Sequence, residues 1–423
     1  MKRIALLGGS GASTPELADA LARRYPRDGS EIEIVLQGRN HEKLAAVQVG
    51  FSARLGGHPA VRVSAESSLD RAVDGATIVI NQVRIGGLDA RAFDERFPRA
   101  FGIFGEETMG PGGFSNAVRT VPALSSTWRS VLAHAPDALV INLTNPSGVV
   151  VAVAHSVHPK LNIVSVCDVP ATFLRAINAA AGTTHPANFA SAEPRRYIGL
   201  NHAGVWVPPH TVGAAPFATA HREIDADVVE GLGAIPVPYL RFYLHPKRQY
   251  DAQREAKETR AEALMRLEPT LLAEAREGRV DAGVTRRGAV WYEEIIAPLV
   301  AVHLRADVGA GIGQSPLILG LPNHGAAPWL PTGVVVEGVA ALSDGSWGQR
   351  ELFEPPSGAR DLLARVAAYE SALVAALQPA GTTGDLGDSS RAALVEALAL
   401  NPAVNDHDLA AQLYGAIEAS PHA

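Results

Sequence analysis

The sequence has little cysteine, no surplus of basic residues and no long apolar run. Cys167 is the only cysteine among 423 residues, so no disulfide can form within the chain, which is typical of the reducing cytoplasm. The 37 Lys and Arg residues stand against 44 Asp and Glu residues, which argues against a nucleic-acid partner. The absence of a run of about 18 apolar residues argues against a membrane span. The apolar segment near the start is too short for a signal peptide.

The chain is nevertheless long and rich in apolar residues, with 47% of its residues hydrophobic and 19% charged. This length favours two or three structural units, and the composition allows a large buried core. Helical patterns alternate with short apolar segments at 3–7, 31–36, 60–63, 76–80, 138–141 and 162–166. Such alternation predicts an α/β fold with a parallel, doubly wound sheet of the Rossmann type.

After about residue 170 the pattern changes to amphipathic helices at 228–233, 252–278 and 359–377, which are separated by proline-rich connections. Apolar residues that recur with helical spacing indicate helices with one buried face. We therefore expect a Rossmann-like domain over residues 1–170 and a mostly helical α+β domain over residues 171–423.

A glycine-rich loop lies between the first predicted strand and a predicted helix. Thr14 stands at the N-cap of this helix, Pro15 at its first position and Glu16 in its first turn. Free backbone amides at such a helix start bind the pyrophosphate of a dinucleotide, although Thr14 replaces the third glycine of the usual G-x-G-x-x-G pattern. The candidate cofactor-binding residues are Gly8, Gly9, Ser10, Gly11, Ser13, Thr14 and, at the end of the fourth predicted strand, Asn81.

The second predicted strand ends without the Asp or Glu that usually binds the ribose hydroxyls of NAD. Arg39 lies just beyond that strand, and its guanidinium could attract a 2′-phosphate, which would favour NADP. If Arg39 is instead solvated, backbone contacts would hold NAD. The residues leave both cofactors open.

Polar motifs also follow the fourth and fifth predicted strands, at the sheet edge where open α/β sheets bind ligands. Arg84 and Arg91 lie on a glycine-rich turn and helix, and this pair suits an anionic substrate. The glycine-dense segment 105–113, which contains Glu107, suggests a loop that approaches a ligand closely. Asn145 precedes a proline, and its amide could bind sugar hydroxyls or form a turn.

Cys167 and Asp168 follow the sixth predicted strand, and His202 lies 35 residues after the cysteine. A thiolate and an imidazole are both good ligands for a divalent transition metal, with positions left open for substrate oxygens. The spacing alone does not establish a metal site, because one cysteine and one histidine so far apart carry little information.

Taken in order, these motifs resemble family 4 of the glycoside hydrolases, and most closely its 6-phospho-β-glucosidase branch. The similarity covers nearly the whole chain, and the motifs are specific as a set although each is weak alone. They are Gly8-Gly9-Ser10, Thr14-Pro15-Glu16, Arg84-Ile85-Gly86-Gly87-Leu88, residues 105–113, Thr144-Asn145-Pro146, Cys167-Asp168-Val169-Pro170, Gly199-Leu200-Asn201-His202, Ile235-Pro236, Tyr239-Leu240, Thr259-Arg260-Ala261-Glu262, Pro322-Asn323, and Val334-Val335 with Glu337.

The resemblance implies a cytoplasmic homodimer or homotetramer that uses NAD and a divalent metal, usually manganese, to hydrolyse a small glycoside. NAD would oxidise the sugar at C3, a base would remove the C2 proton, and the C1–O bond would break by elimination. Water would then add and the same cofactor would return the hydride, while the metal polarises the ketone. No net redox change would result.

The resemblance also assigns roles to individual residues. Cys167 and His202 match the metal ligands, and Tyr239 matches the catalytic base, for which Tyr243 is a rival. A tyrosine near a metal and arginines can have a lowered pKa, which would make it a usable base. The residues implied in substrate binding are Arg91, Glu107, Asn145 and Arg260.

Three departures from the family pattern affect the substrate. Glu106 stands where glutamine is typical, and Phe97-Pro98-Arg99-Ala100 replaces a stretch that usually ends in lysine. Asp168 matches the general acid of α-acting members, whereas β-acting members carry asparagine there. The need for a 6-phosphate and the anomer cleaved are therefore open.

Two other functions compete with a glycosidase. A dehydrogenase of the malate or lactate type shares the fold, but it would need a His–Asp pair and no metal. A non-catalytic sugar or nucleotide sensor could use a degraded enzyme scaffold, although Cys167, His202 and Tyr239 are all retained.

Overall fold

The computed structural model describes residues 1–25, 31–180, 193–209, 215–279, 289–306, 317–343, 346–349, 352–378 and 391–422. Their strands form one sheet of twelve strands in the order β3-β2-β1-β4-β5-β6-β10-β11-β7-β8-β9, with β12 paired to β11. The strands are β1 (Lys2–Leu7), β2 (Ile32–Gln37), β3 (Val61–Glu66), β4 (Ile78–Asn81), β5 (Leu139–Asn142), β6 (Ile163–Ser165), β7 (Tyr197–Leu200), β8 (Ala203–Trp206), β9 (Ile235–Pro236), β10 (Leu317–Pro322), β11 (Val335–Ser343) and β12 (Ser346–Gln349).

The strands β1 to β6 are parallel, and their order 3-2-1-4-5-6 is that of a doubly wound sheet. Successive side chains of β1 point to opposite faces, so Ile4 and Leu6 join one hydrophobic core while Ala5 and Leu7 join another. Since both faces are covered, these strands are apolar almost throughout, as parallel strands usually are. The predicted Rossmann-like sheet is confirmed.

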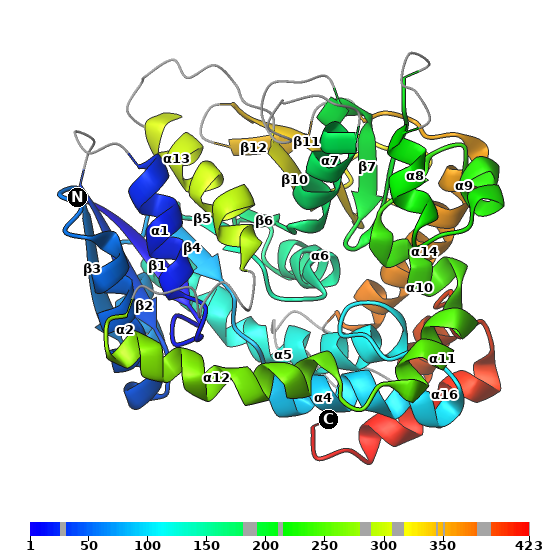
Figure 1. Ribbon diagram of the computed structural model, residues 1–423, viewed down its shortest axis with the longest axis horizontal. Coiled ribbons are helices and arrows are strands. Elements are labelled where there is room, and N and C mark those ends of the chain that lie inside the picture. Colours follow the sequence, from blue (N-terminus) through cyan, green and yellow to red (C-terminus); the bar gives the residue numbers. More distant parts are fainter. Residues whose placement is uncertain are drawn as a thin grey trace.

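The helices and helical turns connect the strands and cover the sheet (Figure 1). They are α1 (Pro15–Arg24), α2 (His41–Leu55), α3 (Leu69–Val73), α4 (Gly87–Arg96), α5 (Gly110–His134), α6 (Ser147–Val157), α7 (Val169–Ala180), α8 (Ala215–His221), α9 (Ala226–Leu232), α10 (Arg241–Leu244), α11 (Pro246–Glu255), α12 (Arg260–Arg276), the π-helical turn η5 (Tyr292–Ile296), α13 (Ala297–Ala306), α14 (Ser357–Ala376), α15 (Arg391–Ala399) and α16 (His407–Glu418), with 3-10 turns at Phe97–Phe101, Glu193–Arg196 and Pro238–Leu240.

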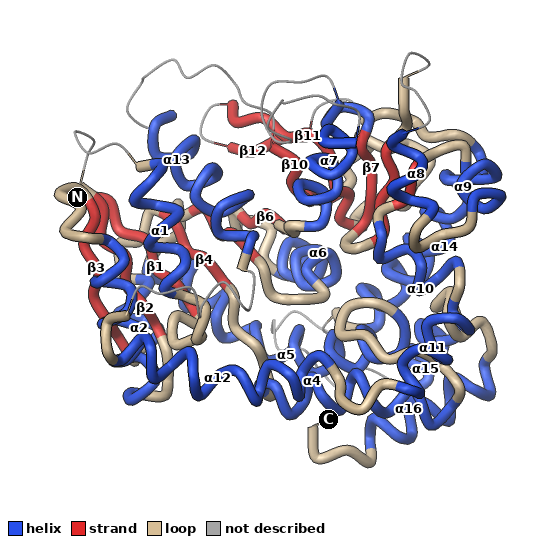
Figure 2. The backbone as a smooth tube through the Cα atoms, viewed as in Figure 1, coloured by secondary structure: helices blue, strands red, loops and turns tan. Residues whose placement is uncertain are grey.

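The sheet continues beyond residue 170 with further strands, drawn in red in Figure 2, and these strands pair antiparallel. β6 pairs with β10 where Ser165 lies opposite Gly320, and β10 pairs in turn with β11. β11 then pairs with β7, where Glu337 lies opposite Gly199. The second half of the chain therefore contains strands as well as many helices, as the α+β prediction requires.

Two helices from the second half of the chain pack against helices of the first half. α12 packs against α2 and α4, and α13 packs against α1, as Figure 1 shows for the yellow-green helices beside the blue ones. Leu271 of α12 and Leu299 of α13 belong to the same hydrophobic core as Ile4, Leu17 and Ile34. We call this the shared core, because residues from both halves of the chain complete it.

The structure corrects two local predictions. The helix predicted over 252–278 is two helices, α11 and α12, because Thr259 accepts a hydrogen bond from the Glu262 amide while the Glu262 side chain accepts one from the Thr259 amide. Thr14 does stand at the N-cap of α1, but its side chain makes no capping hydrogen bond. None of the described helices has the length and apolar character needed to cross a membrane.

Candidate active site

The glycine loop after β1 lies close against the ends of two neighbouring strands. A Cβ atom on Gly9 would lie 2.9 Å from the Gln37 amide nitrogen and the Leu36 Cα, so only glycine fits without displacement. Gly8 has a φ of +79° and lies against the backbone of Gln82. The Gly11 amide donates to the Gly8 carbonyl over 3.1 Å, which closes the turn that leads into α1. The loop is a backbone-lined cradle of the kind that holds a pyrophosphate.

The other candidate cofactor-binding residues have different surroundings. Ser13 and Thr14 are buried, Ser10 is half-buried, and Arg39 is exposed just beyond β2. Asn81 is fully buried, and its Nδ2 donates to Asn142 Oδ1 over 2.8 Å and to Thr144 Oγ1 over 3.1 Å. The Asn81 amide nitrogen therefore joins the ends of β4 and β5, while its Oδ1 has no hydrogen-bond partner among the described residues.

Arg84 and Arg91 both pair with one buried carboxylate, Glu107. The Arg91 Nη1 lies 2.9 Å from Glu107 Oε1, Arg84 bonds to Glu107 Oε2, and the Arg91 Nε donates to Glu95 over 2.7 Å. Burial acts to raise the pKa of Glu107, but the two guanidinium groups overcome it and hold this pKa at about 2. Each arginine is thus at least partly neutralised by the protein itself.

Three glycines of the segment 105–113 lie against the protein's own backbone, so internal packing by itself requires glycine at these positions. A Cβ atom on Gly105 would lie 1.9 Å from the Glu95 carbonyl oxygen. On Gly112 it would lie 2.3 Å from the Glu106 carbonyl oxygen, and on Gly113 2.0 Å from that of Thr108. These glycines let the loop fold against α4 and start α5.

Glu106, which departs from the family pattern, accepts hydrogen bonds from the amides of Thr108 and Met109 over 2.7 and 2.6 Å. The carboxyl therefore lies at the start of α5. Burial, together with the negative charge of Glu107, raises the pKa of Glu106 to about 7. A neutral and an ionised form of this side chain are both accessible near physiological pH.

Cys167 and Asp168 lie just beyond β6, at the carboxyl edge of the parallel strands. The buried Cys167 thiol accepts a hydrogen bond from the Val169 amide over 3.5 Å. Burial and the nearby carboxylates of Glu337 and Asp168 raise the pKa of the thiol. Burial also raises the pKa of Asp168, which favours the protonated form that a general acid needs.

His202 lies in the two-residue turn between β7 and β8, with a φ of 63°. The side chain is buried, and its Nδ1 has no hydrogen-bond partner among the described residues. Burial lowers the pKa of His202 to about 4, so the imidazole is neutral and can donate a lone pair. The preceding Asn201 fixes this turn, because its Oδ1 accepts from the Ser147 amide at the start of α6 over 3.0 Å.

Tyr239 lies beside His202, with 4.4 Å between the ring centroids. The Arg241 guanidinium lies 5.5 Å from the Tyr239 ring centroid. In the protein without a metal, burial and the negative charges of Glu106, Cys167 and Asp168 raise the pKa of Tyr239. The hydroxyl of the rival Tyr243 accepts a hydrogen bond from the Gly110 amide over 3.3 Å.

The residues Cys167 and His202 fit a metal that takes further ligands from its substrate. Within the described ranges, no group of three or more His, Cys, Asp and Glu side chains could hold a metal by itself. The unpartnered Nδ1 of His202 and the thiol of Cys167, which forms no disulfide, are the donor types that a divalent transition metal prefers. Such an incomplete set leaves positions open for substrate oxygens.

The two remaining predicted substrate residues occupy different positions. Asn145 is half-buried beside β5, and its carbonyl accepts from Asn116 Nδ2 over 3.1 Å. Arg260 is exposed at the first position of α12. The next residue, Ala261, donates its amide to Glu95, the carboxylate that also holds Arg91. Arg260 is therefore linked to the arginine cluster through the backbone of α12.

Sequence reasoning did not assign a role to Glu337, although its motif was noted. Glu337 is buried and accepts a hydrogen bond from the Tyr197 hydroxyl over 3.0 Å, and burial raises its pKa to about 8. No sequence signal could have located this pair, because Tyr197 and Glu337 are 140 residues apart and meet only across the sheet.

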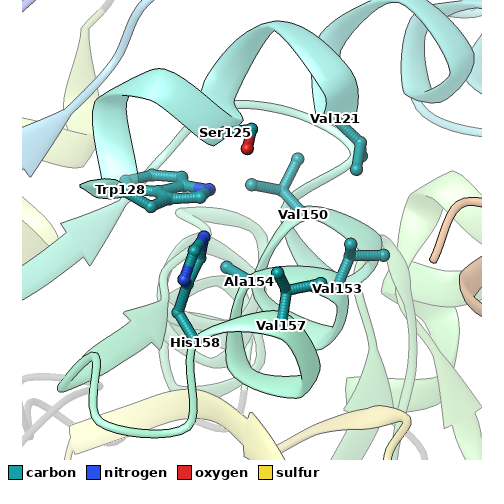
Figure 3. A pocket seen from close by; sticks show the side chains of 8 residues that line it. All are labelled: Val121, Ser125, Trp128, Val150, Val153, Ala154, Val157 and His158. Atoms are coloured by element: carbon teal, nitrogen blue, oxygen red, sulfur yellow. The ribbon is translucent and has the colours of Figure 1, made fainter. Parts of the chain in front are cut away.

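A small apolar pocket between α5 and α6 contains none of the predicted site residues (Figure 3). Trp128 and His158 line one side of it in this view, and valines supply most of the remaining wall. Burial lowers the pKa of His158, and its Nε2 finds no partner within the described part of the chain. The predicted metal ligands and the predicted base lie instead around Cys167 and Tyr239.

Comparison with known proteins places these observations in a family. The model of the family 4 glycosyl hydrolases matches residues 3–182, and the model of their C-terminal domain matches residues 197–404. The chain is 26% identical over 97% of its length to a "Probable 6-phospho-beta-glucosidase" of Bacillus subtilis, of which 94% is covered. It is 29% identical over 79% of its length to a 6-phospho-beta-glucosidase of Thermotoga maritima, of which 80% is covered.

The solved structures agree with this similarity in fold. The Thermotoga maritima 6-phospho-beta-glucosidase solved with NAD and glucose-6-phosphate superimposes with a TM-score of 0.84, at 24% identity, over 98% of this chain and 97% of that one. A 6-phospho-alpha-glucosidase from gut microorganisms, solved with NAD and glucose-6-phosphate, superimposes with a TM-score of 0.82 at 19% identity, over 98% and 96% of the two chains.

Proposed function

The chain belongs to the family 4 glycosyl hydrolases, and we propose that it cleaves β-linked 6-phosphoglucosides with NAD and a divalent metal. The observation that carries this proposal is the cluster of Cys167, His202 and Tyr239, which three separate segments bring together. The names of two relatives, each similar over most of the chain, support the substrate class. A Thermotoga relative solved with manganese, NAD and glucose-6-phosphate supports the cofactors.

Each residue of the cluster has a chemical task that its surroundings support. When bound, NAD supplies a hydride acceptor and the metal supplies a Lewis acid. Cys167 and His202 would hold the metal through the thiolate and the neutral imidazole, and the glycine loop would hold the pyrophosphate. The Tyr239 oxygen would take the C2 proton, since a cation beside it stabilises the phenolate and offsets the effect of burial.

Two further groups would orient the sugar and its leaving group. Asp168, with its raised pKa, would protonate the departing oxygen at C1. Arg91, fixed by Glu95 and Glu107, retains donor groups that could bind the anionic end of the substrate. Because Asp168 resembles the acid of α-acting relatives, an α-linked 6-phosphoglucoside is the second candidate substrate.

A panel of nitrophenyl glycosides tests the proposal. Glucosides of both anomers, with and without a 6-phosphate, should be assayed with manganese, NAD and a reductant. We expect turnover of the 6-phospho-β-glucoside, many cycles for each bound NAD, and no accumulation of NADH. Turnover of the α-anomer alone would select the second candidate, turnover only without phosphate would refute the phosphorylated substrate, and stoichiometric NADH would identify a dehydrogenase.

The division of labour along the chain is part of the same proposal. Residues 1–170 would bind the dinucleotide, and residues 171–423 would supply the metal ligand His202, the base Tyr239 and the surface for a homodimer or homotetramer. The enzyme would act in the cytoplasm. Light scattering of the purified chain measures the oligomeric state, and a monomer at all concentrations would contradict that part.

A further inference from the structure

The glycine loop is held in place by a side chain that comes from the next strand end. The Gln82 amide nitrogen donates to the Gly8 carbonyl over 3.3 Å and to the Thr14 hydroxyl over 3.1 Å. Both acceptors belong to the loop, one at its first glycine and one at the entry to α1. Thr14 makes no cap to its own helix, because its hydroxyl is turned toward Gln82.

The other end of the Gln82 amide is bound by a residue 210 positions away. Tyr292 donates its hydroxyl to Gln82 Oε1 over 2.7 Å, and the Tyr292 side chain is almost completely buried in the shared core. With two donors and one acceptor of Gln82 engaged, the amide has a single satisfactory orientation. The hydroxyl of Tyr292 therefore fixes the side chain that fixes the loop.

Tyr292 lies at the start of the only π-helical turn in the described part of the chain, η5. Such turns are rare and occur frequently at functional sites. Three residues earlier, the Ala289 amide donates to the Glu16 carboxylate in the first turn of α1 over 3.2 Å. A short segment of the second half thus contacts the loop and its helix at two points, through Gln82 and through Glu16.

We propose that Tyr292 is a positioning residue for the dinucleotide, which acts through Gln82 on the glycine loop. The inference rests on the proposed binding of NAD by that loop. A loop already held in its binding conformation loses less freedom when it takes up a ligand, and so it binds more tightly. The affinity of residues 8–14 for NAD is therefore set partly by a tyrosine from the far half of the sequence.

Tyr292→Phe removes only the hydroxyl, and the measurement is the dissociation constant of NAD by fluorescence or calorimetry without substrate. We expect the constant to rise about threefold to tenfold, the effect of one buried hydrogen bond. A purely structural role would lower the melting temperature of the cofactor-free protein and leave the constant unchanged, and that result would overturn the inference. If the wild-type chain itself does not bind NAD, it is the proposed function that fails.

Gln82→Met keeps the length of the side chain and removes its polar atoms, and it provides an independent test if Tyr292→Phe folds poorly. We expect a similar or larger loss of NAD affinity. In the double variant the loss should equal that of Gln82→Met alone, because Tyr292 acts only through Gln82. Losses that simply add would overturn the proposed relay, as would wild-type affinity in both single variants.

Glu293→Gln is the matched control on the same π-helical turn. Glu293 pairs with Arg23 and Arg24 at distances of 2.7 and 3.0 Å, but these side chains are substantially exposed. Exposed ion pairs contribute little, so the NAD dissociation constant should stay within about twofold of wild type. Hydrogen exchange of residues 8–14 in the cofactor-free protein should be faster in Tyr292→Phe and unchanged in Glu293→Gln. A loss of affinity in Glu293→Gln equal to that in Tyr292→Phe would overturn the specific role of the hydroxyl.

Discussion

The glycine loop and the cluster around Cys167 both lie at the carboxyl ends of strands of the same sheet. The loop is formed by backbone atoms, whereas the cluster is formed by side chains. The loop is backbone, closely packed and without charge, and it lies within a single strand–loop–helix unit. The cluster consists of titratable side chains from separate segments, and burial together with nearby carboxylates raises the pKa values of Cys167 and Tyr239. We therefore expect binding at the glycine loop to tolerate changes in nearby charge, whereas the chemistry of the cluster around Cys167 should depend on the charges around it.

The largest expected effect is a complete loss of turnover without a loss of NAD affinity. Cys167→Ser or His202→Ala should abolish turnover, because each removes one of the two protein ligands proposed for the metal. The NAD dissociation constant should stay within about twofold of wild type, since the glycine loop is unchanged. Full activity of the chelator-treated wild-type enzyme would show that the metal has no role.

Tyr239→Phe should reduce the turnover rate by roughly 10²–10⁴, the usual contribution of a positioned base. The cofactor and metal should still bind, and the exchange of the C2 hydrogen of substrate with solvent should slow with the reaction. Tyr243→Phe is the matched control, because its hydroxyl contacts the Gly110 amide instead. If the two variants lose activity in the opposite order, Tyr243 is the base.

The ion pairs of Glu107 with Arg84 and Arg91 should make the stability of the protein depend on pH in the acid range. The pKa of Glu107 is lowered to about 2, so its contribution to stability is present at neutral pH and is lost as the pH falls from about 4.5 toward 2. Glu107→Gln removes this contribution, of about 3 kcal/mol by linkage, at neutral pH. Urea unfolding of both proteins between pH 7 and 3.5 measures the difference, and a gap that does not narrow in acid would contradict the ion-pair explanation.

The smallest expected effect concerns the backbone region. Arg39 is exposed beyond β2, where it could attract a 2′-phosphate, and an exposed pair contributes modestly. We therefore expect NAD and NADP to bind with similar affinity, and Arg39→Ala to weaken NADP alone. If NAD binds more than about tenfold tighter to the wild-type protein, a difference of roughly 1.4 kcal/mol, Arg39 does not contact that phosphate.

The same contrast explains what the sequence could predict. The strand, glycine loop and helix at residues 2–24 are encoded locally, in apolar runs and in the N-terminal signals Pro15 and Glu16. The break between α11 and α12 has a local signal in the capping-box spacing of Thr259 and Glu262, but the prediction of one helix over 252–278 missed it. The parallel, doubly wound character of strands β1 to β6 followed from the alternation of strands and helices, whereas their order was not predicted.

Long-range pairing could not be predicted in the same way. Arg84 and Arg91 read as a site for an anion, and only the fold shows that Glu107 already satisfies part of their charge. The contact between Tyr292 and Gln82 spans 210 positions and has no local signature. Family resemblance did bring Cys167, His202 and Tyr239 together, since a conserved order of motifs carries spatial information that single residues lack.

The shared core also has a consequence for synthesis on the ribosome. Strands β1 to β6 are complete when Ser165 has emerged, but Tyr292, Leu299 and Leu304, which cover the same apolar face, are synthesised more than a hundred residues later. At about 5–20 residues per second, the nascent first half waits on the order of ten seconds with that face uncovered. During this interval Leu17, Leu21 and their neighbours lack the side chains of η5 and α13 that help to bury them in the finished protein.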